Sequence, residues 1–388
     1  MNDTPLPRNV PGTESTQVEP HRLTALCGAQ PGERVLVAMS GGVDSSVAAL
    51  VLRDAGLEAQ GVTLKLFENE DVYLADSRVC CSLKDAEDAR QVCLTLGIPH
   101  YVYNFTRTFN ADVIDRFCDG YLRGETPNPC IDCNRYVKFA ALQQRRCELE
   151  FDYVATGHYA RRAYDPESER YLLKCGIDAN KDQSYVLFHL TQDHLAHMLF
   201  PLGEFAKPQV RALAQQSGFI NASKQESQDI CFVPNGDYAS FIRARRGIAP
   251  EPGNIVDRAG RVLGRHAGLI GYTVGQRKGI GVAATEALYV YAKDAERNEL
   301  VVDIDAKTRR DALEVRDVNF IAVAGLAQPR RLLVKAHYRQ KARPATVEQV
   351  DDARVRVRFD EPQRACAPGQ AAVFYDGDTV VGGGTIER

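Results

Sequence analysis

The sequence predicts an α/β protein in which a doubly wound parallel-sheet domain is followed by a small mixed domain and a C-terminal antiparallel β-barrel. Strands and helices alternate from residue 34 to about residue 178, glycine is dense between residues 247 and 281, and short alternating runs follow residue 306. Repeated βα units build parallel sheets with helices on both faces, whereas several short alternating strands favour a barrel or sandwich.

The expected boundaries divide the chain into a tail at 1–21, the parallel-sheet domain at 22–225, the small central domain at 226–305 and the barrel at 306–388. The tail is rich in Pro, Thr and Ser and lacks the basic and apolar regions of a signal peptide, so we expect it to be disordered.

Within the first domain, apolar runs and their glycine or proline ends predict the elements in order. Strands are expected at 35–39, 61–66, 101–105 and 153–156, and helices at 46–55, 83–96, 111–122 and 136–149. Helical signals return between residues 191 and 216, where Pro208 suits a first helical turn. Barrel strands are expected at 345–349, 354–359 and 371–375.

Composition narrows the class of protein. The chain has 388 residues, 44% of them apolar and 26% charged, which is typical of a globular protein. No apolar run is long enough for a membrane span, so no membrane partner is expected. Eleven cysteines without a secretory signal indicate a reducing, cytoplasmic location, where they serve as core residues, metal ligands or catalytic thiols.

The most specific motif is the loop Ser40–Ser46, which connects a predicted strand to a predicted helix. Its glycines allow a backbone to approach phosphate closely, and the helix N-terminus presents N–H groups to an anion. Asp44 is placed to hold the Mg²⁺ that accompanies a pyrophosphate. The loop is not a Walker A motif. It resembles the PP-loop of the ATP pyrophosphatase superfamily, whose members split ATP into AMP and pyrophosphate while adenylating a substrate.

Three cysteines are candidates for a chemical role: Cys130, Cys133 and Cys231. Cys130-Ile131-Asp132-Cys133 precedes a predicted helix, a position shared by metal or cluster ligands, redox dithiols and low-pKa nucleophiles. A second CxxC that would complete a zinc site is missing. Cys231 is isolated near the predicted domain junction, and the adjacent Cys80 and Cys81 are expected to have no catalytic role.

Further motifs follow the loop in a fixed order, and together they resemble the bacterial tRNA-specific 2-thiouridylases over nearly all of the chain after residue 30. The motifs are Thr126–Asn134 with Lys138-Phe139, Ala155–Tyr159, Asn180–Tyr185, Asp229–Phe232, Gly275–Gly279, His337–Gln340, Pro368–Gln370 and Gly382–Gly384. The resemblance implies an ATP-dependent enzyme that makes 2-thiouridine at the wobble position, position 34, of tRNA.

Carried over to this chain, the resemblance implies three sets of site residues. ATP would be bound by Ala38, Met39, Ser40, Gly41, Gly42, Val43, Asp44, Ser45, Leu64 and Gly157. Cys133 would be the nucleophilic thiol, and Cys231 the residue that carries or resolves a persulfide. The target base and the rest of the tRNA would be contacted by Asn128, Pro129, Cys130, His158, Lys181, Asp182, Gln183, His337, Tyr338 and Gln370.

The implied cofactors and partners follow from the same resemblance. They are ATP with Mg²⁺, tRNAs with a wobble uridine (the Lys, Glu and Gln acceptors), and a cysteine desulfurase or sulfur-relay carrier. Cys130 departs from the family, since many members have Asp there, and Leu64 stands where some have Met. The basic run 306–345, with ten Lys/Arg against three Asp/Glu, suits a tRNA backbone.

Two sulfur chemistries stay open at this point. A persulfide could attack the adenylated uridine while the second cysteine resolves it as a disulfide, so that each round needs a reductant. Alternatively, Cys130, Cys133 and Cys231 could hold a [4Fe-4S] cluster whose open iron binds sulfide. Rival functions are an amide-forming PP-loop enzyme, a non-catalytic PP-loop RNA-binding protein and a zinc-stabilised scaffold. An amide-forming enzyme would leave Cys133 and Cys231 without a role. The intact Ser40, Asp44 and Ser45 argue against a non-catalytic RNA-binding protein.

Overall fold

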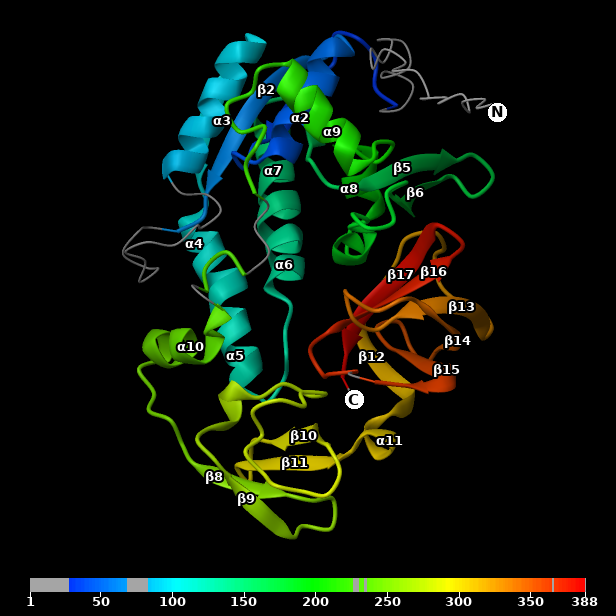
Figure 1. Ribbon diagram of the computed structural model, residues 1–388. Helices are drawn as coiled ribbons and strands as arrows, with labels where there is room; N and C mark the ends of the chain where they lie inside the picture. Colours follow the sequence, from blue (N-terminus) through cyan, green and yellow to red (C-terminus); the bar gives the residue numbers. More distant parts are fainter. Residues whose placement is uncertain (1–27, 68–82, 226–229, 234–235, 365, 388) are drawn as a thin grey trace, which may run out of the picture.

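The computed structural model describes residues 28–67, 83–225, 230–233, 236–364 and 366–387. Figure 1 shows a parallel-sheet domain at the top, a small sheet domain at the bottom and a β-barrel at the lower right. The predicted tail and the Cys80-Cys81 pair lie outside the described residues.

A five-stranded parallel sheet, with the order β3-β2-β1-β4-β7, forms the centre of the first domain. Its strands are β1 Arg34–Ala38, β2 Glu58–Lys65, β3 His100–Asn104, β4 Tyr153–Ala155 and β7 Met198–Leu199. Along β1, Val35 and Val37 join one hydrophobic cluster and Leu36 another, because successive side chains point to opposite faces. Both faces of the sheet are therefore covered, and the doubly wound arrangement is confirmed.

Helices from different parts of the chain cover the two faces. One face packs against α2, α3 and α9, which span Val43–Asp54, Leu83–Leu96 and Lys207–Gln216. The other face packs against two long helical segments, which Figure 1 shows running from the sheet toward the small domain. The first consists of α4 Thr106–Phe109, η1 Asn110–Asp115 and α5 Arg116–Leu122, and the second of α6 Pro129–Asp132, η2 Cys133–Ala141 and α7 Leu142–Glu148.

The second long helix begins earlier than the sequence predicted. It starts at Pro129 instead of residue 136, because the Asn128 side chain accepts a hydrogen bond from the Cys130 backbone N–H at 3.1 Å and Pro129 occupies the first turn. Cys130 and Cys133 therefore lie inside the first turns of the helix and not ahead of it. From Cys133 to Ala141 the helix has the wider π-turn.

Six antiparallel strands form the C-terminal barrel, which is closed by the pairing of β12 with β17. They are β12 Arg310–Phe320, β13 Arg330–Lys335, β14 Arg343–Gln349, β15 Val355–Gln363, β16 Ala371–Asp376 and β17 Thr379–Ile386. A hairpin from the first domain, β5 Ala160–Asp165 and β6 Arg170–Cys175, extends this sheet through β17. The predicted barrel is confirmed, but its sheet also contains these two strands from the first domain.

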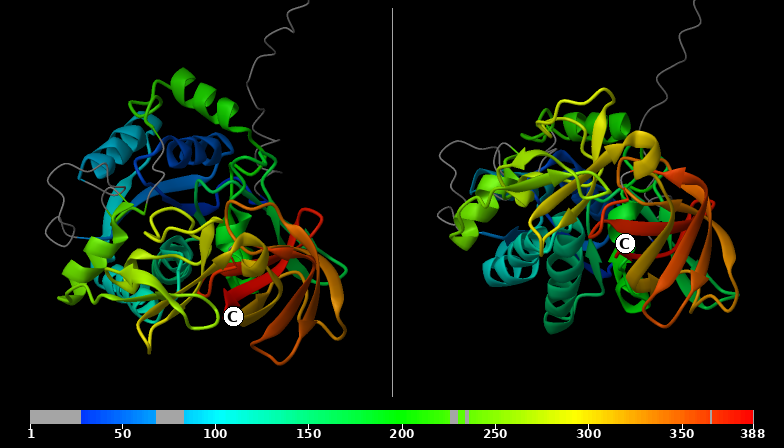
Figure 2. Two further views of the ribbon diagram at one scale, coloured as in Figure 1. Left: turned by 60° about the horizontal axis from the view of Figure 1, so that its bottom comes forward. Right: turned by 90° about the horizontal axis from the view of Figure 1, so that it is seen from below.

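The small central domain has a four-stranded mixed sheet in the order β10-β11-β8-β9. Its elements are α10 Tyr238–Arg246, β8 Gly253–Val256, β9 Val262–His266, η5 Leu269–Gly271, β10 Leu288–Asp294, β11 Glu299–Ile304 and α11 Asp305–Thr308. Figure 2, seen from below, places this sheet in front of the long helices and beside the barrel. The short elements η3 Ser184–Leu187 and α8 Gln192–Ala196 lie between β6 and β7 in the sequence. None of the described helices is both long and apolar enough to cross a lipid bilayer.

Candidate active site

The loop between β1 and α2 is held by its own serines. The Ser40 backbone N–H donates to Ser45 Oγ at 3.2 Å, and the hydroxyls of Ser45 and Ser46 each donate to the Gly42 carbonyl at 3.0 Å. The N-cap residue Gly42 supplies no side-chain acceptor to the first turn of α2. No side chain of the N-cap residue therefore occupies the first turn of α2, and binding of an anion there stays a prediction.

Two glycines allow this loop to pack closely against other segments. Gly41 has a φ of +70°, and a Cβ at this position would lie 2.3 Å from the Asp85 carbonyl oxygen at the start of α3. A Cβ at Gly157, beyond β4, would lie 2.8 Å from the Ser45 backbone nitrogen. Only glycine fits these positions without displacing backbone, so the loop stays open toward a ligand.

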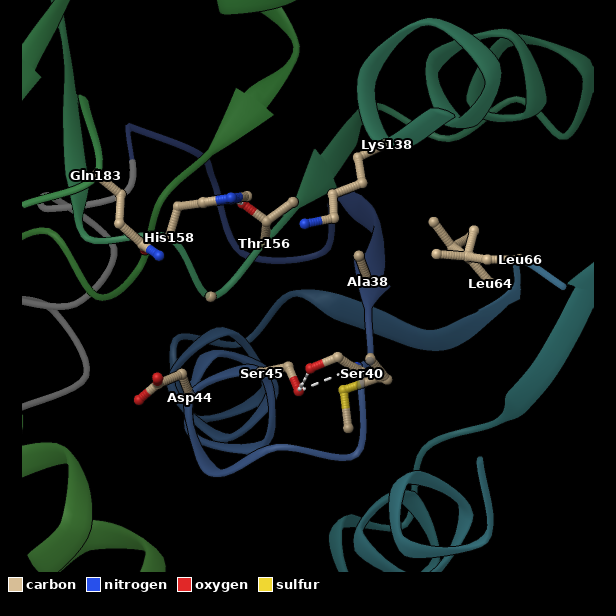
Figure 3. Close-up of a pocket in the computed structure, with 12 residues that line it drawn as sticks. Ala38, Ser40, Asp44, Ser45, Leu64, Leu66, Lys138, Thr156, His158 and Gln183 are labelled. Atoms are coloured by element: carbon tan, nitrogen blue, oxygen red, sulfur yellow. Dashed lines mark hydrogen bonds between the residues drawn. The ribbon is translucent and has the colours of Figure 1, made fainter. Parts of the chain in front are cut away.

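A cavity of about 210 Å³ opens beside the loop at the carboxyl ends of the parallel strands (Figure 3). Leu64 and Leu66 form an apolar side, whereas Lys138, Thr156 and His158 form a polar side. Ligands of doubly wound sheets bind at this edge, and an apolar wall with a few polar groups suits a nucleoside. The remaining lining residues are Ala38, Met39, Ser40, Asp44, Ser45, Gly157 and Gln183. All of these except Gln183 were predicted from the sequence to bind ATP.

A second cavity of about 330 Å³ shares Ser40, Asp44 and Gln183 with the first and is lined by three lysines, Lys181, Lys207 and Lys224. Adjoining cavities, one partly apolar and one cationic, match the nucleoside and the phosphate chain of ATP. In this structure, the Lys207 ammonium lies 2.6 and 2.8 Å from the two carboxylate oxygens of Asp44. The predicted Mg²⁺ ligand is thus paired with a buried cation.

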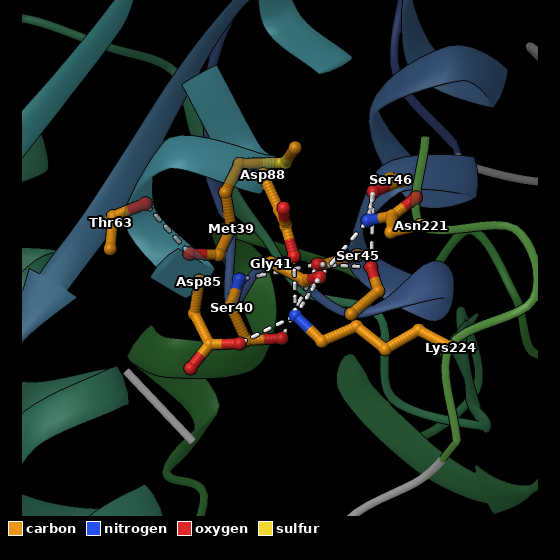
Figure 4. A network of polar contacts seen from close by, with 11 residues as sticks. Met39, Ser40, Gly41, Ser45, Ser46, Thr63, Asp85, Asp88, Asn221 and Lys224 are labelled. Atoms are coloured by element: carbon orange, nitrogen blue, oxygen red, sulfur yellow. Dashed lines mark hydrogen bonds and ion pairs between the residues drawn. The ribbon is translucent and has the colours of Figure 1, made fainter. Parts of the chain in front are cut away.

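Lys224 ties the loop to α3, as Figure 4 shows. Its ammonium donates to the Gly41 carbonyl at 3.1 Å and to the carboxylates of Asp85 and Asp88 at 2.5 and 2.6 Å. Burial opposes the charge of Lys224, but its hydrogen bonds with the two carboxylates outweigh that effect and raise its pKa. The side chain of Asn221 supports the same loop by donating to the Gly41 carbonyl at 3.0 Å.

The two cysteines of the CxxC motif differ in exposure. Cys130 is exposed, whereas Cys133 is only 8% exposed and belongs to the hydrophobic cluster on one face of the sheet. Burial raises the pKa of the Cys133 thiol to about 11, while the Lys138 ammonium acts in the opposite direction. Between them, burial raises the pKa of Asp132 to about 6, against the effect of the nearby Arg116.

Lys138 links two features: the helix that carries Cys130 and Cys133, called the cysteine helix below, and the cavity of about 210 Å³ beside the loop, called the nucleotide cavity below. It follows Cys133 by five residues, which in an α-helix would place it about 140° around the axis. The i to i+5 hydrogen bonding of η2 brings such positions closer to one side. Lys138 therefore lines the nucleotide cavity and also acts electrostatically on Cys133.

Cys231 borders the same hydrophobic cluster as Cys133, and its neighbour Phe232 stacks edge-on against Phe109 and Phe117. Neither cysteine forms a disulfide in this structure. Over the part of the chain that the structure describes, no three His, Cys, Asp or Glu side chains are grouped to hold a metal ion. Cys130, Cys133 and Cys231 thus do not fit an iron–sulfur cluster in this arrangement.

The residues that the resemblance assigns to tRNA fall into two groups. Lys181 and Tyr338, from the first domain and the barrel, both line the cationic cavity. Burial raises the pKa of Tyr338, and the charges of Asp182 and Cys130 act in the same direction. His337 is adjacent in sequence, and burial lowers its pKa, as do Arg339 and Lys335.

The other group makes contacts within the protein. His158 is 8% exposed and bonded to Thr156 Oγ1 at 2.7 Å, and burial together with Lys138 holds its pKa well below the usual range. Asp182 accepts from the Gly176 and Ser184 backbone N–H groups, both at 3.1 Å. Gln183 Oε1 accepts from the Tyr159 N–H at 3.0 Å, and Gln370 Nε2 donates to the Thr126 carbonyl at 2.6 Å.

Several residues that line the two cavities received no role from the sequence, among them Lys138, Thr156, Lys207 and Lys224. Lys138 and Thr156 stand inside quoted motifs but received no role. Lys207 directly precedes Pro208, which was used only as a helix-start signal. Lys224 gave no local signal, because its two acidic partners lie 139 and 136 residues away.

Comparison with protein families assigns most of the chain. Residues 33–235 match a family described as the tRNA methyl transferase HUP domain, and residues 240–303 match the PRC-barrel domain of the same name. Residues 310–386 match an aminomethyltransferase β-barrel domain.

Three relatives share about half of their residues with the chain. The protein named tRNA-specific 2-thiouridylase MnmA from Moorella thermoacetica is 51% identical over 352 residues, which cover 91% of this chain and 99% of that protein. The protein of the same name from Symbiobacterium thermophilum is 50% identical over 366 residues, covering 93% and 94%. MnmA 2 from Caldanaerobacter subterraneus subsp. tengcongensis is 49% identical over 362 residues, covering 92% and 99%.

Proposed function

The chain belongs to the family of tRNA-specific 2-thiouridylases, and from this premise we propose that it converts the wobble uridine of tRNA to 2-thiouridine with ATP and a cysteine-bound sulfur. The observation that supports this most strongly is the position of Lys138, which lines the nucleotide cavity and acts on Cys133. An amide-forming enzyme with the same loop would have no use for a thiol next to its nucleotide site.

In the first step, O2 of the uridine attacks the α-phosphorus of ATP, and pyrophosphate leaves. Lys207, Lys181 and the N-terminus of α2 surround the cationic cavity and would stabilise the negative charge of the leaving pyrophosphate. Mg²⁺ would be held by Asp44 and would neutralise phosphate charge. Lys207 would release Asp44 for this purpose.

In the second step, sulfur replaces the adenylated oxygen. The terminal sulfur of a persulfide on Cys231 attacks C2 of the uridine, and AMP leaves with the former O2. The Cys133 thiolate then attacks the inner sulfur, which breaks the S–S bond and leaves 2-thiouridine and a Cys133–Cys231 disulfide. A dithiol reductant restores both thiols, and a cysteine desulfurase or relay carrier restores the persulfide.

The proposed partners follow from the same residues. A tRNA whose anticodon begins with uridine, as in the Lys, Glu and Gln acceptors, would place this base near Asn128, Pro129 and Cys130. Tyr338 lines the cationic cavity and is 39% exposed, so its ring is available to a splayed-out base. The cluster alternative would require Cys231 to move to Cys130 and Cys133, and no step is assigned to it.

The decisive experiment measures both products at once. Protein purified without air is given ATP, Mg²⁺, a persulfide donor, a dithiol and unmodified tRNA, and 2-thiouridine and pyrophosphate are quantified. We expect both from the wild type, pyrophosphate alone from Cys133→Ser, and both from Cys130→Ser. Loss of 2-thiouridine in Cys130→Ser, together with bound iron, would favour the cluster.

Other outcomes would overturn the proposal. Pyrophosphate release that depends on ammonia or an amino acid instead of tRNA would indicate an amide-forming enzyme. Binding of tRNA without pyrophosphate release would indicate a non-catalytic RNA-binding protein. Methylated tRNA formed only with a methyl donor would support the chemistry suggested by the older family description.

A further inference from the structure

The connector that leads from α5 to the cysteine helix, residues 124–128, has no regular secondary structure and is held mainly by other domains. Thr126 bonds with the barrel through both of its backbone polar groups. Its N–H donates to the Pro368 carbonyl at 2.7 Å, and its carbonyl accepts from Gln370 Nε2 at 2.6 Å. The backbone of the 124–128 connector is thus held by the barrel through one backbone and one side-chain hydrogen bond.

The central domain holds the preceding residue. Lys293, on β10, donates from its ammonium to the Glu125 carbonyl and to the Tyr272 carbonyl, each at 3.1 Å. The ammonium also lies 5.1 Å from the centre of the Tyr121 ring on α5. Burial lowers the pKa of Lys293 to about 8, against the effect of Glu125. Taking an ammonium partly out of water costs free energy, and these two hydrogen bonds offset that cost.

The barrel adds two further contacts to the connector. Arg316, on β12, lies 3.1 Å from Glu125 Oε1. Gly369 has a φ of +86°, and a Cβ there would lie 2.9 Å from Glu125 Cβ and 3.0 Å from the Thr126 nitrogen. The Pro368–Gln370 turn therefore fits against the connector only because residue 369 lacks a side chain.

The part of the connector between Thr126 and Cys130 is short and stiff. Only Pro127, Asn128 and Pro129 separate Thr126 from Cys130. The two prolines have fixed φ angles, and each restricts the residue before it. Asn128 caps the helix at the same time. A displacement of Thr126 would therefore be passed on to Cys130 and the first turn of the helix.

From these contacts we propose that Lys293 and Gln370 are positioning residues for sulfur transfer, which hold the 124–128 connector so that the cysteine helix faces the activated uridine. The two domains that would hold tRNA are thereby joined directly to the helix that carries Cys133. Their positions relative to the first domain set the position of the cysteines. The proposal rests on the proposed function for its catalytic part and only on the protein's own contacts for its structural part.

The test compares Lys293→Met and Gln370→Met, which preserve side-chain length and remove the donors. In the ligand-free full-length protein, we expect amide hydrogen exchange over residues 126–133 to become about tenfold faster in each variant. With all substrates present, the ratio of pyrophosphate to 2-thiouridine should rise by about ten- to a hundredfold, because adenylation continues while misplaced sulfur transfer slows. Lys293→Arg keeps a donor at this position, so its exchange rate and its product ratio should lie closer to those of the wild type than those of Lys293→Met do.

A matched control is Arg354→Met, which removes an exposed barrel cation paired with Asp351. It should change neither the exchange nor the ratio. The proposal is overturned if both test variants exchange like the wild type, or if they lose pyrophosphate release and 2-thiouridine in parallel. It is also overturned if Gln370→Met only weakens tRNA binding while Lys293→Met has no effect. A wild type without either product would reject the proposed function, yet the exchange measurement would still decide the structural part.

Discussion

At the scale of single residues, the pair of Asp44 and Lys207 best explains how the phosphate site stays intact without a ligand. The Lys207 side chain is only 9% exposed, and Tyr159 also donates its hydroxyl to Asp44 at 2.8 Å. The carboxylate proposed to hold Mg²⁺ is thus neutralised by a lysine ammonium. Under the proposed function, the same ammonium would contact the phosphate chain once a metal ion had taken its place at Asp44.

Replacing Lys207 by Met should therefore affect both stability and adenylation. Asp44 would keep only the Tyr159 hydrogen bond, and we expect the free energy of unfolding to fall by about 1–3 kcal/mol. Pyrophosphate release should fall by about 10²–10³-fold, the usual cost of losing one preorganised donor. Calorimetry and a pyrophosphate assay measure the two effects. The double variant Asp44→Asn/Lys207→Met should regain stability but not activity. Pyrophosphate release by Lys207→Met within twofold of the wild-type rate would refute the role given to Lys207.

The thiol of Cys133 gives a second prediction, about pH. Its pKa of about 11 means that the thiol is protonated in the ligand-free protein at neutral pH. Alkylation of Cys133 by iodoacetamide, followed by peptide mass spectrometry, should rise about tenfold per pH unit from pH 7 to 10 without a plateau. Lys138→Met should slow it further at each pH, because the ammonium lowers this pKa, and Lys138→Arg should not. A plateau below pH 9 would contradict the buried, protonated thiol.

At the scale of elements, the glycine loop between β1 and α2 offers a matched pair of substitutions. Gly41 has a left-handed φ and touches the Asp85 carbonyl, whereas Gly42 has a φ of −90° and a Cβ there would meet only Ser40 Oγ, at 3.4 Å. Gly41→Ala should lower the free energy of unfolding by about 1–3 kcal/mol, and Gly42→Ala by much less. Thermal unfolding of the ligand-free variants measures this, and equal losses would mean that the approach to α3 is not tight.

Elements with a local signal were predictable, and those defined by distant partners were not. The span of α3 and the nucleotide loop followed from apolar periodicity and from the Ser/Gly motif, both of which lie within a few residues. The β5–β6 hairpin was missed because its partner β17 lies about 200 residues away and its own run of Arg and Tyr gives little alternation. Lys207 was missed for the same reason, since 163 residues separate it from Asp44.

Strand β16 shows why the barrel was easier to recognise than its packing. Its residues Ala371–Tyr375 are all buried, whereas the sequence predicted one of several short alternating strands here. Ala372 and Phe374 point into the barrel's own cluster, whereas Val373 and Tyr375 pack into the cluster below the parallel sheet. A strand that is buried on both faces has no polar alternation, and the sequence alone cannot show what covers its second face.

At the scale of the whole molecule, this shared packing means that the barrel and the first domain have one hydrophobic cluster in common, and each also has a cluster of its own. The cluster that holds Leu36 of β1 and Cys133 also holds Ile321, Val373 and Val380 of the barrel. Hydrogen bonds cross the same boundary, such as Asn319 Nδ2 to the Phe188 carbonyl at 2.8 Å. The central domain differs in part, because five of its buried residues form a separate small cluster around Val290, although Phe241 and Ile242 of α10 belong to the shared cluster.

The unfolding behaviour should follow these cores and not the order of domains along the chain. Val373→Ala and Val290→Ala each remove two methyl groups from a side chain with 0% exposure, and each should cost about 1–3 kcal/mol. Val373→Ala should speed hydrogen exchange of the slowest amides in β1 as well as in the barrel, because both unfold as one unit. Val290→Ala should speed exchange in β8, β10 and β11 and leave β1 unchanged. If hydrogen exchange in β1 were unchanged in Val373→Ala, the barrel would be an independently folding unit. Its contact with the 124–128 connector would then be an interface between two separately folding domains.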